Sequence, residues 1–352
     1  MKTRVCRLYG QGDIRIEEAD VAAPGPGEVL VAMAAGGICG SDLHYYQDGG
    51  FGPIRVREPI VLGHEVAGTV RAVGAGVEGV APGDRVAVNP SRPCNACRYC
   101  LDGLQQHCLA MRFFGSALRF PHEQGGFRDL MVVDAFQCVR VDNPEVSLAE
   151  AACAEPLAVC LHALNRAGAS AGNLAGKSVL VTGAGPIGAL TVAAARHAGA
   201  AEIVATDLQD LPLEVARRMG ATETVNVRTA PERLDAFFEG KGCFDVAFEC
   251  SAAAPALKTA VTATRPQGTV VAVGVAGDVP VPLNLIVGKE IAFVGTHRFT
   301  REYAEAVRLI DRRRIDVRPI VTSTHDLADA LAAFQAAGDR ARSIKVQLSF
   351  AS

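Results

Sequence analysis

The chain has 352 residues, of which 49% are hydrophobic and 21% are charged, with 35 Lys and Arg against 38 Asp and Glu. This composition is typical of a soluble globular protein of about two domains, and it excludes disordered and collagen-like fibrous chains. The near-neutral charge without a basic run, together with the absence of Trp, argues against a nucleic acid or a membrane surface as partner.

The first 150 residues are predicted to form a β-rich domain. Their short apolar runs are separated by Gly and Pro turn signals, and no long helix is expected before about residue 147. The strands expected there are 29–33, 66–73 and 85–88.

After residue 147 the pattern changes to a helix over 148–164 and then to alternating strands and helices. That alternation predicts a parallel, doubly wound α/β sheet. We therefore expect a doubly wound domain at 151–289 and a β-rich domain made of 1–150 and 290–352. The predicted strands are 178–182, 202–206, 225, 244–249 and 269–274, and the predicted helices are 187–198, 213–219 and 254–263.

No membrane span or leader is expected. The uncharged stretch 178–195 is interrupted by Gly183, Gly185, Pro186 and Gly188, and the first ten residues contain no apolar segment typical of a signal peptide. A cytoplasmic location follows, and there the eleven cysteines favour metal sites over disulfides.

A glycine-rich loop follows the first strand of the alternating region. The loop opens a helix, and Asp207 ends the next strand, as in a dinucleotide-binding fingerprint. An acid at that position accepts hydrogen bonds from ribose hydroxyls and repels a 2′-phosphate, so NAD is predicted over NADP. The predicted cofactor-binding residues are Gly183, Gly185, Pro186, Ile187, Gly188, Asp207, Val273, Gly274 and Val275.

Two groups of residues have the chemistry of zinc sites. Cys94, Cys97, Cys100 and Cys108 have spacings that suit a closed, structural zinc, the alternatives being an iron–sulfur cluster or chance clustering. A second, dispersed group has the soft and nitrogen donors of a catalytic zinc, with Glu65 or Glu155 able to supply the oxygen ligand. Its members are Cys39, His64, Glu65 and Glu155.

The chain resembles the zinc-dependent medium-chain alcohol dehydrogenases along its whole length. The segment 63–68, the four-cysteine loop and the segment 183–188 occur in the order found in that family. The resemblance implies a GroES-like catalytic domain, a Rossmann domain, two zinc ions per chain, NAD, and a homodimer or homotetramer. Glu155 stands where the family's third zinc ligand is a cysteine, which is similar to the polyol dehydrogenase branch.

Within that branch, four segments resemble the enzymes that oxidise L-idonate: 36–46, 111–116, 120–127 and 298–300. The resemblance implies reversible, NAD-linked oxidation of a secondary hydroxyl of a sugar acid, L-idonate to 5-keto-D-gluconate. It also implies that Ser41 passes the proton through a ribose hydroxyl to His44, and that Asp42 orients His64. The substrate residues expected are Tyr45, Glu155, Arg298 and Arg112, with Arg298 the first choice for the carboxylate and Arg112 or Arg119 in reserve.

Two other functions remain open from the sequence. A neutral-polyol dehydrogenase acting on sorbitol or xylitol would use the same zinc and nucleotide motifs. A non-catalytic NAD sensor or scaffold is disfavoured by the complete set of Cys39, His64, Ser41 and His44, because a sensor needs no proton path.

Overall fold

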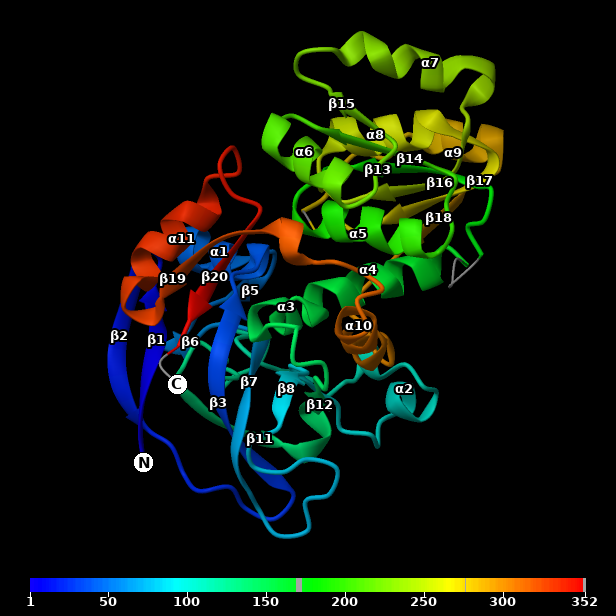
Figure 1. The fold of residues 1–352 in the computed structure, drawn as a ribbon. Coiled ribbons are helices and arrows are strands. Elements are labelled where there is room, and N and C mark those ends of the chain that lie inside the picture. Colours follow the sequence, from blue (N-terminus) through cyan, green and yellow to red (C-terminus); the bar gives the residue numbers. More distant parts are fainter. Residues whose placement is uncertain (169–172, 276, 351–352) are drawn as a thin grey trace.

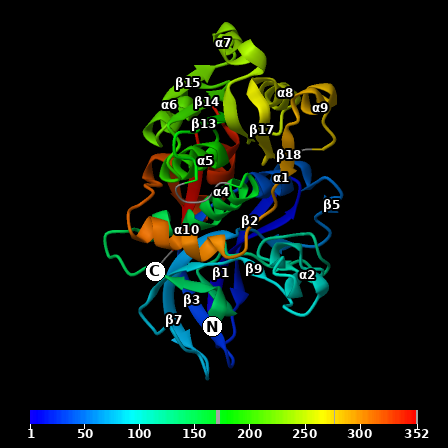
Figure 2. The same cartoon turned by 90° about the vertical axis from the view of Figure 1, so that its right-hand side faces the viewer.

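The computed structural model describes residues 1–168, 173–275 and 277–350, and Figure 1 shows that they form two lobes. Both ends of the chain lie in one lobe, while the middle of the chain forms the other. Turned by 90°, the structure shows α4 and α10 crossing the region between the lobes (Figure 2). None of the helices in the described ranges is both long and apolar enough to span a bilayer.

The lobe that contains the termini is β-rich, as predicted. Its main sheet has the order β12-β8-β7-β3-β20-β19, with β11 also paired to β3. The last strand of the chain joins the first part by pairing antiparallel with β3, where Ser349 lies opposite Ala35. The seven strands are β3 (Glu28–Gly37), β7 (Glu65–Val73), β8 (Arg85–Val88), β11 (Leu130–Asp134), β12 (Cys138–Arg140), β19 (Val321–Asp326) and β20 (Lys345–Ser349).

Smaller elements complete this lobe. A three-stranded sheet has the order β2-β1-β6, and two pairs of short strands lie beside it. These strands are β1 (Lys2–Gly10), β2 (Asp13–Asp20), β4 (Gly50–Phe51), β5 (Ile54–Arg55), β6 (Ile60–Val61), β9 (Ser91–Arg92) and β10 (Arg112–Phe113). The helices are α1 (Gly40–Asp48), α2 (Arg98–Leu101), α3 (Leu148–Ala152) and α11 (Ala330–Gly338).

Helix α1 corrects the expectation that no helix precedes residue 147. It begins after Cys39, whose backbone N–H donates to the Asp42 carboxylate at 2.9 Å. The side chain of Asp42 thus supplies half of a capping box, which satisfies a donor that the first turn would otherwise leave unpaired. The sequence pattern did not reveal it because only Asp42 and Tyr45 of its nine residues are buried, so no apolar stripe marks the helix.

The second lobe is a doubly wound sheet of six parallel strands in the order β15-β14-β13-β16-β17-β18. This order places the topological switch point between β13 and β16, where open α/β sheets bind ligands. The strands are β13 (Ser178–Thr182), β14 (Glu202–Asp207), β15 (Glu223–Asn226), β16 (Phe244–Glu249), β17 (Thr264–Ala272) and β18 (Ala292–Gly295). The helices are α4 (Ala154–Arg166), α5 (Pro186–His197), α6 (Asp210–Arg218), α7 (Asp235–Phe238), α8 (Ala254–Ala263), α9 (Leu283–Lys289) and α10 (Glu302–Asp311).

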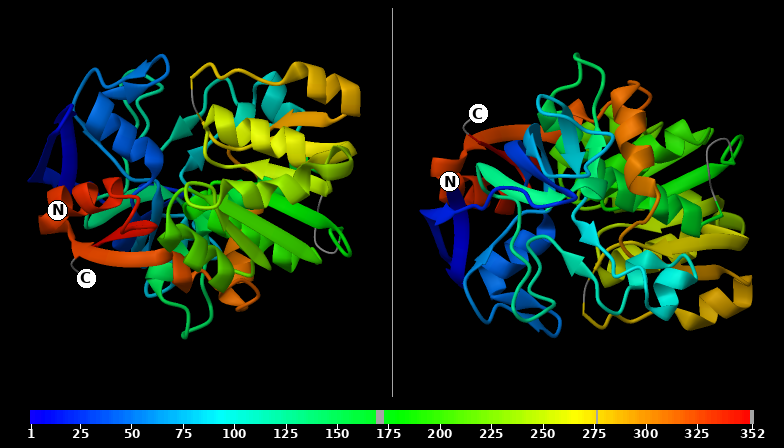
Figure 3. Two further views of the ribbon diagram at one scale, coloured as in Figure 1. Left: turned by 90° about the horizontal axis from the view of Figure 1, so that it is seen from above. Right: turned by 90° about the horizontal axis from the view of Figure 1, so that it is seen from below.

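Successive residues of β13 explain why helices cover both faces of this sheet. Val179 and Val181 belong to the same apolar cluster as Val192 of α5. Leu180 belongs to a second cluster, together with Leu257 of α8. Because strand side chains alternate between faces, a strand that is apolar throughout needs a helix on each side. The views in Figure 3 show the helices on either side of these strands.

Two details of the predicted boundaries are wrong. Strand β18 pairs with β17 in the doubly wound sheet, so a boundary at residue 290 is too early. The helix predicted over 148–164 is two helices, α3 and α4, which meet at Cys153. The second helix carries Pro156 in its first turn, where the missing backbone N–H costs no intrahelical bond.

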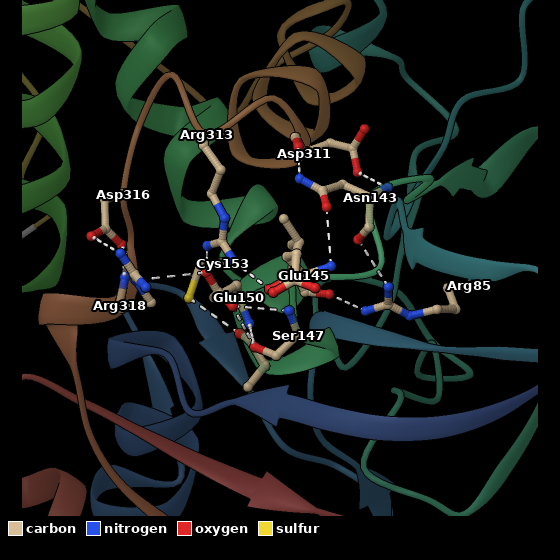
Figure 4. Close-up of polar contacts among 12 residues, drawn as sticks. Arg85, Asn143, Glu145, Ser147, Glu150, Cys153, Asp311, Arg313, Asp316 and Arg318 are labelled. Atoms are coloured by element: carbon tan, nitrogen blue, oxygen red, sulfur yellow. Dashed lines mark hydrogen bonds and ion pairs between the residues drawn. The ribbon is translucent and has the colours of Figure 1, made fainter.

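The junction between the lobes is held by a buried carboxylate (Figure 4). Glu150 of α3 accepts hydrogen bonds from the backbone N–H and the hydroxyl of Ser147, at 2.9 and 2.7 Å. Its other oxygen pairs with Arg313, which follows α10 and also donates to the carbonyl of Glu145. Segments more than 160 residues apart in the sequence are therefore joined by one ion pair.

Replacing Arg313 with alanine should lower the free energy of unfolding by about 1–3 kcal/mol, because it leaves the buried Glu150 carboxylate short of a charged donor. Arg318→Ala is the matched control, since Arg318 lies 4.0 Å from the same carboxylate but is largely exposed and paired with Asp316. The control should cost less than about 1 kcal/mol. Urea unfolding of the two variants measures the difference, and equal losses would contradict this account of the junction.

Candidate active site and zinc sites

The first predicted zinc ligands meet between α1 and β7. Cys39 directly precedes α1, and His64 and Glu65 stand at the start of β7. One potential ligand atom from each of the three lies within 4.8 Å of the others. Glu155 is not part of this group. It is buried in α4, where burial raises its pKa, the charge of His64 lowers it and the charge of Glu65 raises it.

Asp42 lies beside the ring of His64, which it is predicted to orient. Its carboxylate is fully buried, 3.7 Å from Nδ1 of His64, and it accepts the N–H of Gly63 at 3.4 Å. Burial raises the pKa of Asp42, whereas the charge of His64 and the two backbone donors oppose the rise. Burial also lowers the pKa of His64, but the charges of Asp42 and Cys39 outweigh it and raise that pKa well above its usual value.

Glu65 has one satisfied oxygen and one free oxygen. Its Oε1 accepts from Nζ of Lys345 at 2.8 Å, in an ion pair whose side chains are 1% and 3% exposed. Its Oε2 is buried without a hydrogen-bond partner and approaches Gly37 so closely that a Cβ there would lie 2.1 Å away. An unsatisfied carboxylate oxygen beside a thiol and an imidazole fits a zinc ligand set.

The four-cysteine group is also assembled. One sulfur from each of Cys94, Cys97, Cys100 and Cys108 lies within 4.8 Å of the others, and all four thiols are free. Backbone N–H groups of Cys97 and Ala110 donate to the sulfurs of Cys94 and Cys108, both at 3.3 Å. Donors directed at sulfur stabilise thiolates, so these residues fit a closed, structural zinc.

The proton-path residues lie on α1. His44 is partly exposed, and its Nδ1 lies 3.0 Å from a carboxylate oxygen of Asp48 one turn later. Ser41 is half-buried near the start of the same helix. Asp48 was not predicted to act here, although its i+4 spacing from His44 was visible in the sequence.

Three of the four predicted substrate residues, Tyr45, Glu155 and Arg298, lie near one another. Tyr45 is buried, and its hydroxyl accepts the N–H of Ala117 at 3.1 Å. Arg298 has its guanidinium 4.3 Å from the ring centroid of Phe113, and burial lowers its pKa while Glu155 and Tyr45 raise it. Burial raises the pKa of Glu155 to about 7 against the opposing charge of His64.

Arg112 does not join them, contrary to prediction. Consecutive residues of a strand point to opposite sides, so β10 directs Phe113 toward Arg298 and Arg112 away from it. The guanidinium of Arg112 instead pairs with Glu123 at 2.6 Å and lines a separate cavity of about 330 Å³. Arg119 donates to the backbone carbonyls of Leu109 and Ala110.

The glycine loop joins β13 to α5 at the switch point of the sheet. A Cβ on Gly188 would lie 1.8 Å from the carbonyl oxygen of Gly183, so no larger residue fits there. A Cβ on Gly185 would meet nothing within 4 Å, which leaves the first turn of α5 open to a phosphate group. Asp207 ends β14 and accepts the N–H of Ala184 at 2.8 Å, so it also braces the loop.

The other predicted cofactor residues follow β17. Val273 is buried, Val275 is exposed, and a Cβ on Gly274 would lie 2.4 Å from the backbone nitrogen of Ala252. The sequence analysis missed Glu249, which ends β16 and accepts hydrogen bonds from Ser251 and Ala252. Glu249 could have been found from its position at the end of a predicted parallel strand, where Asp207 also lies and where such sheets bind ligands.

Comparison with known proteins identifies the family. Residues 25–143 match the alcohol dehydrogenase GroES-like domain, and residues 186–312 match the zinc-binding dehydrogenase family. L-idonate 5-dehydrogenase (NAD(P)(+)) of Escherichia coli K12 is 39% identical over 99% of both chains. The chain belongs to the zinc-binding dehydrogenases. It has their medium-chain fold and is an oxidoreductase of the alcohol and polyol dehydrogenase class.

Other zinc-binding dehydrogenases are similar along the whole chain. Sorbitol dehydrogenase of Gallus gallus is 36% identical, over 97% of this chain and 94% of its own. The crystal structure of the E. coli L-idonate 5-dehydrogenase superposes with a TM-score of 0.94 over 99% of both chains, at 39% identity. A putative zinc-binding dehydrogenase of Sinorhizobium meliloti, solved with NADP, reaches 0.88 over 99% of both chains, at 29% identity.

Proposed function

We propose that the chain catalyses the reversible, NAD-linked oxidation of a secondary hydroxyl of a sugar acid, L-idonate to 5-keto-D-gluconate. The observation that carries this proposal is Arg298, a half-buried cation beside the zinc ligand set. Within the described residues, no carboxylate lies within 4.0 Å of its guanidinium. A substrate carboxylate would supply the missing anion through charge-assisted hydrogen bonds. The similarity to L-idonate 5-dehydrogenase supports the same substrate.

Two zinc ions per chain are proposed. Cys39, His64 and Glu65 would hold the catalytic ion, with Glu155 close enough to act on it directly or through a water molecule, and the four-cysteine group would hold the structural ion. The catalytic ion supplies Lewis acidity, which lowers the pKa of the substrate hydroxyl. Asp42 holds the His64 ring in orientation, and Lys345 holds Glu65 through its other oxygen.

Proton removal is assigned to α1. Ser41 would accept the proton of the substrate hydroxyl while its own proton passes through a ribose hydroxyl of the bound cofactor to the partly exposed His44, which would release a proton to solvent. Asp48 fixes the orientation of the His44 ring through Nδ1. Tyr45 and Glu155 would bind substrate hydroxyls, and NAD, when bound, would supply the acceptor for the hydride.

NAD is proposed over NADP because of the carboxylate of Asp207. Asp207→Ala should weaken NAD binding about 10-fold or more, since hydrogen bonds to a charged group contribute about 1.5–3 kcal/mol each. It should also narrow the gap to NADP by removing the charge that repels a 2′-phosphate. Dissociation constants for both cofactors measure this effect.

Asp210→Ala is the matched control for Asp207→Ala. Asp210 carries the same charge three residues later, but it is exposed and bonded to Asn226. Its loss should leave both dissociation constants within about twofold. A wild-type protein that binds NADP as tightly as NAD would contradict the role given to Asp207.

A homo-oligomer in the cytoplasm is also proposed. Apolar side chains are exposed along the edge strand β18 and around α9, which supports burial against a second copy. These side chains are Val275, Leu283, Leu285, Val287 and Phe293. Light scattering of the purified chain tests the oligomer, and a monomer at micromolar concentration would contradict it.

The substrate is tested by initial rates with NAD on L-idonate, D-gluconate, sorbitol, xylitol and L-threonine. The proposal predicts the highest kcat/KM for L-idonate. The highest value for sorbitol or xylitol would favour the neutral-polyol alternative, which the 36% identity to sorbitol dehydrogenase supports. No reduction of NAD with any of them would favour the non-catalytic alternative.

A further inference from the structure

The ring of Phe113 lies close to both His64 of the zinc ligand set and Arg298. Its centroid is 5.4 Å from that of the His64 ring, with the two planes inclined by 51°. The guanidinium carbon of Arg298 lies 4.3 Å from the same centroid. Phe113 is 9% exposed and belongs to β10, which pairs with β9. One rigid aromatic ring is therefore close to both His64 and the guanidinium of Arg298.

The contact with Phe113 leaves the guanidinium of Arg298 available to bind an anion. An aromatic face attracts the charge of a guanidinium but accepts none of the five N–H donors that lie in the guanidinium plane. A carboxylate would instead pair with the charge and accept hydrogen bonds from two of those donors. The described residues place no carboxylate at salt-bridge distance from Arg298. The ring holds the side chain in place and leaves its hydrogen-bonding edge free for an anion.

The residue before Arg298 is held by the same part of the chain. The ring of His297 stacks on that of His107, with centroids 5.8 Å apart and planes inclined by 21°. His107 directly precedes Cys108, and Phe113 follows five residues later. The segment 107–113 thus supports both the backbone and the side chain at Arg298, whose backbone has a φ of 51°.

From these contacts we infer that Phe113 is a positioning residue that fixes the Arg298 charge at a set distance from His64 and so selects substrates with a carboxylate. This inference rests on the proposed oxidation of a sugar acid. The site should bind best those polyhydroxy acids that can meet two conditions at once: their carboxylate reaches Arg298, and their reacting hydroxyl lies at the zinc ligand set. Neutral polyols gain nothing from the placement of Arg298 by this ring.

The test compares Phe113→Leu with Phe113→Tyr. Leucine keeps an apolar side chain but removes the π face, whereas tyrosine keeps the face. Phe113→Leu should raise KM for L-idonate about 10-fold with kcat changed less than about twofold, as expected for a lost cation–π contact. It should leave kcat/KM for L-iditol, which has a hydroxymethyl group in place of the carboxylate, within about twofold. Phe113→Tyr should stay near the wild type on both substrates.

Phe114→Leu is the control for packing. Phe114 is the next residue, is also buried, and packs with Met33 and Phe127 in a different apolar cluster from that of Phe113. It should change the ratio of the two kcat/KM values by less than about twofold. Metal content and NAD affinity should be the same in Phe113→Leu and wild type, which shows that the His64 side of the ring is intact.

A double-mutant cycle decides whether Phe113 acts through Arg298. In an Arg298→Ala background, Phe113→Leu should cause no further loss on L-idonate. A full additional loss, an equal loss on L-iditol, or lost zinc would overturn the inference. If the wild type itself shows no preference for L-idonate over L-iditol, both the proposed function and this inference fail. If that preference is as large in Phe113→Leu as in the wild type, only the role of Phe113 fails.

Discussion

Cys39→Ser is expected to abolish turnover, with a loss of about 10³-fold or more in kcat, while the chain remains folded. Cys39 is the thiol of a three-residue ligand group, and replacing groups that merely support zinc ligands already costs about 10- to 100-fold. Cys39 is half-buried and precedes a helix of nine residues of which only two are buried, so the expected loss of stability is modest.

Cys97→Ser should have the opposite profile. It removes one of four sulfurs from a segment with little other regular structure, so the main expected effect is a lower melting temperature or loss of assembly. Cys243→Ser, an exposed thiol outside both groups, is the control. Metal analysis should give two zinc ions per wild-type chain and one in Cys39→Ser. A single zinc in fully loaded wild type would contradict the assignment of two sites.

Arg298→Ala is expected to lower kcat/KM for L-idonate about 10²-fold or more. Truncating one member of a buried charge pair costs about 2–5 kcal/mol, and the substrate carboxylate would be left without its cation. Activity on a neutral polyol should fall much less. Steady-state kinetics on both substrates measure the difference.

Arg301→Ala is the control for Arg298→Ala, because Arg301 is an exposed arginine three residues later. It should leave both values near those of the wild type. Equal losses on acid and polyol in Arg298→Ala would mean that Arg298 binds hydroxyl groups. Arg112 could not then replace it, because its side chain is paired with Glu123 on the other side of β10.

The elements with strong local patterns were predictable from the sequence. Strands β13 and β16 and helix α8 have the predicted bounds, because each is a mainly apolar segment with glycine or proline near one or both of its ends. The four-cysteine group was predictable because its spacing is local. Helix α1 was not, since it begins at a cap that Asp42 supplies and has no apolar stripe.

Features that depend on distant segments were out of reach. Lys345 pairs with Glu65, which lies 280 positions away in the sequence. The apolar pattern of the strand that carries Lys345 does not show which charged residue it contacts. The direction of Arg112 depends on the register of a two-residue strand, so the sequence placed it on the wrong side. Phe113 was singled out only as part of the segment 111–116, and its closeness to both His64 and Arg298 appears only in the fold.

The most direct test of the central claim is the ratio of kcat/KM for L-idonate to that for L-iditol, measured with NAD on the zinc-loaded wild type. The two substrates differ only in the carboxylate that Arg298 is proposed to bind. We expect a ratio of about 10² or more, because L-iditol leaves Arg298 without an anion and so lacks the interaction that Arg298→Ala removes for L-idonate. A ratio near or below one would contradict the account and identify the chain as a dehydrogenase of neutral polyols.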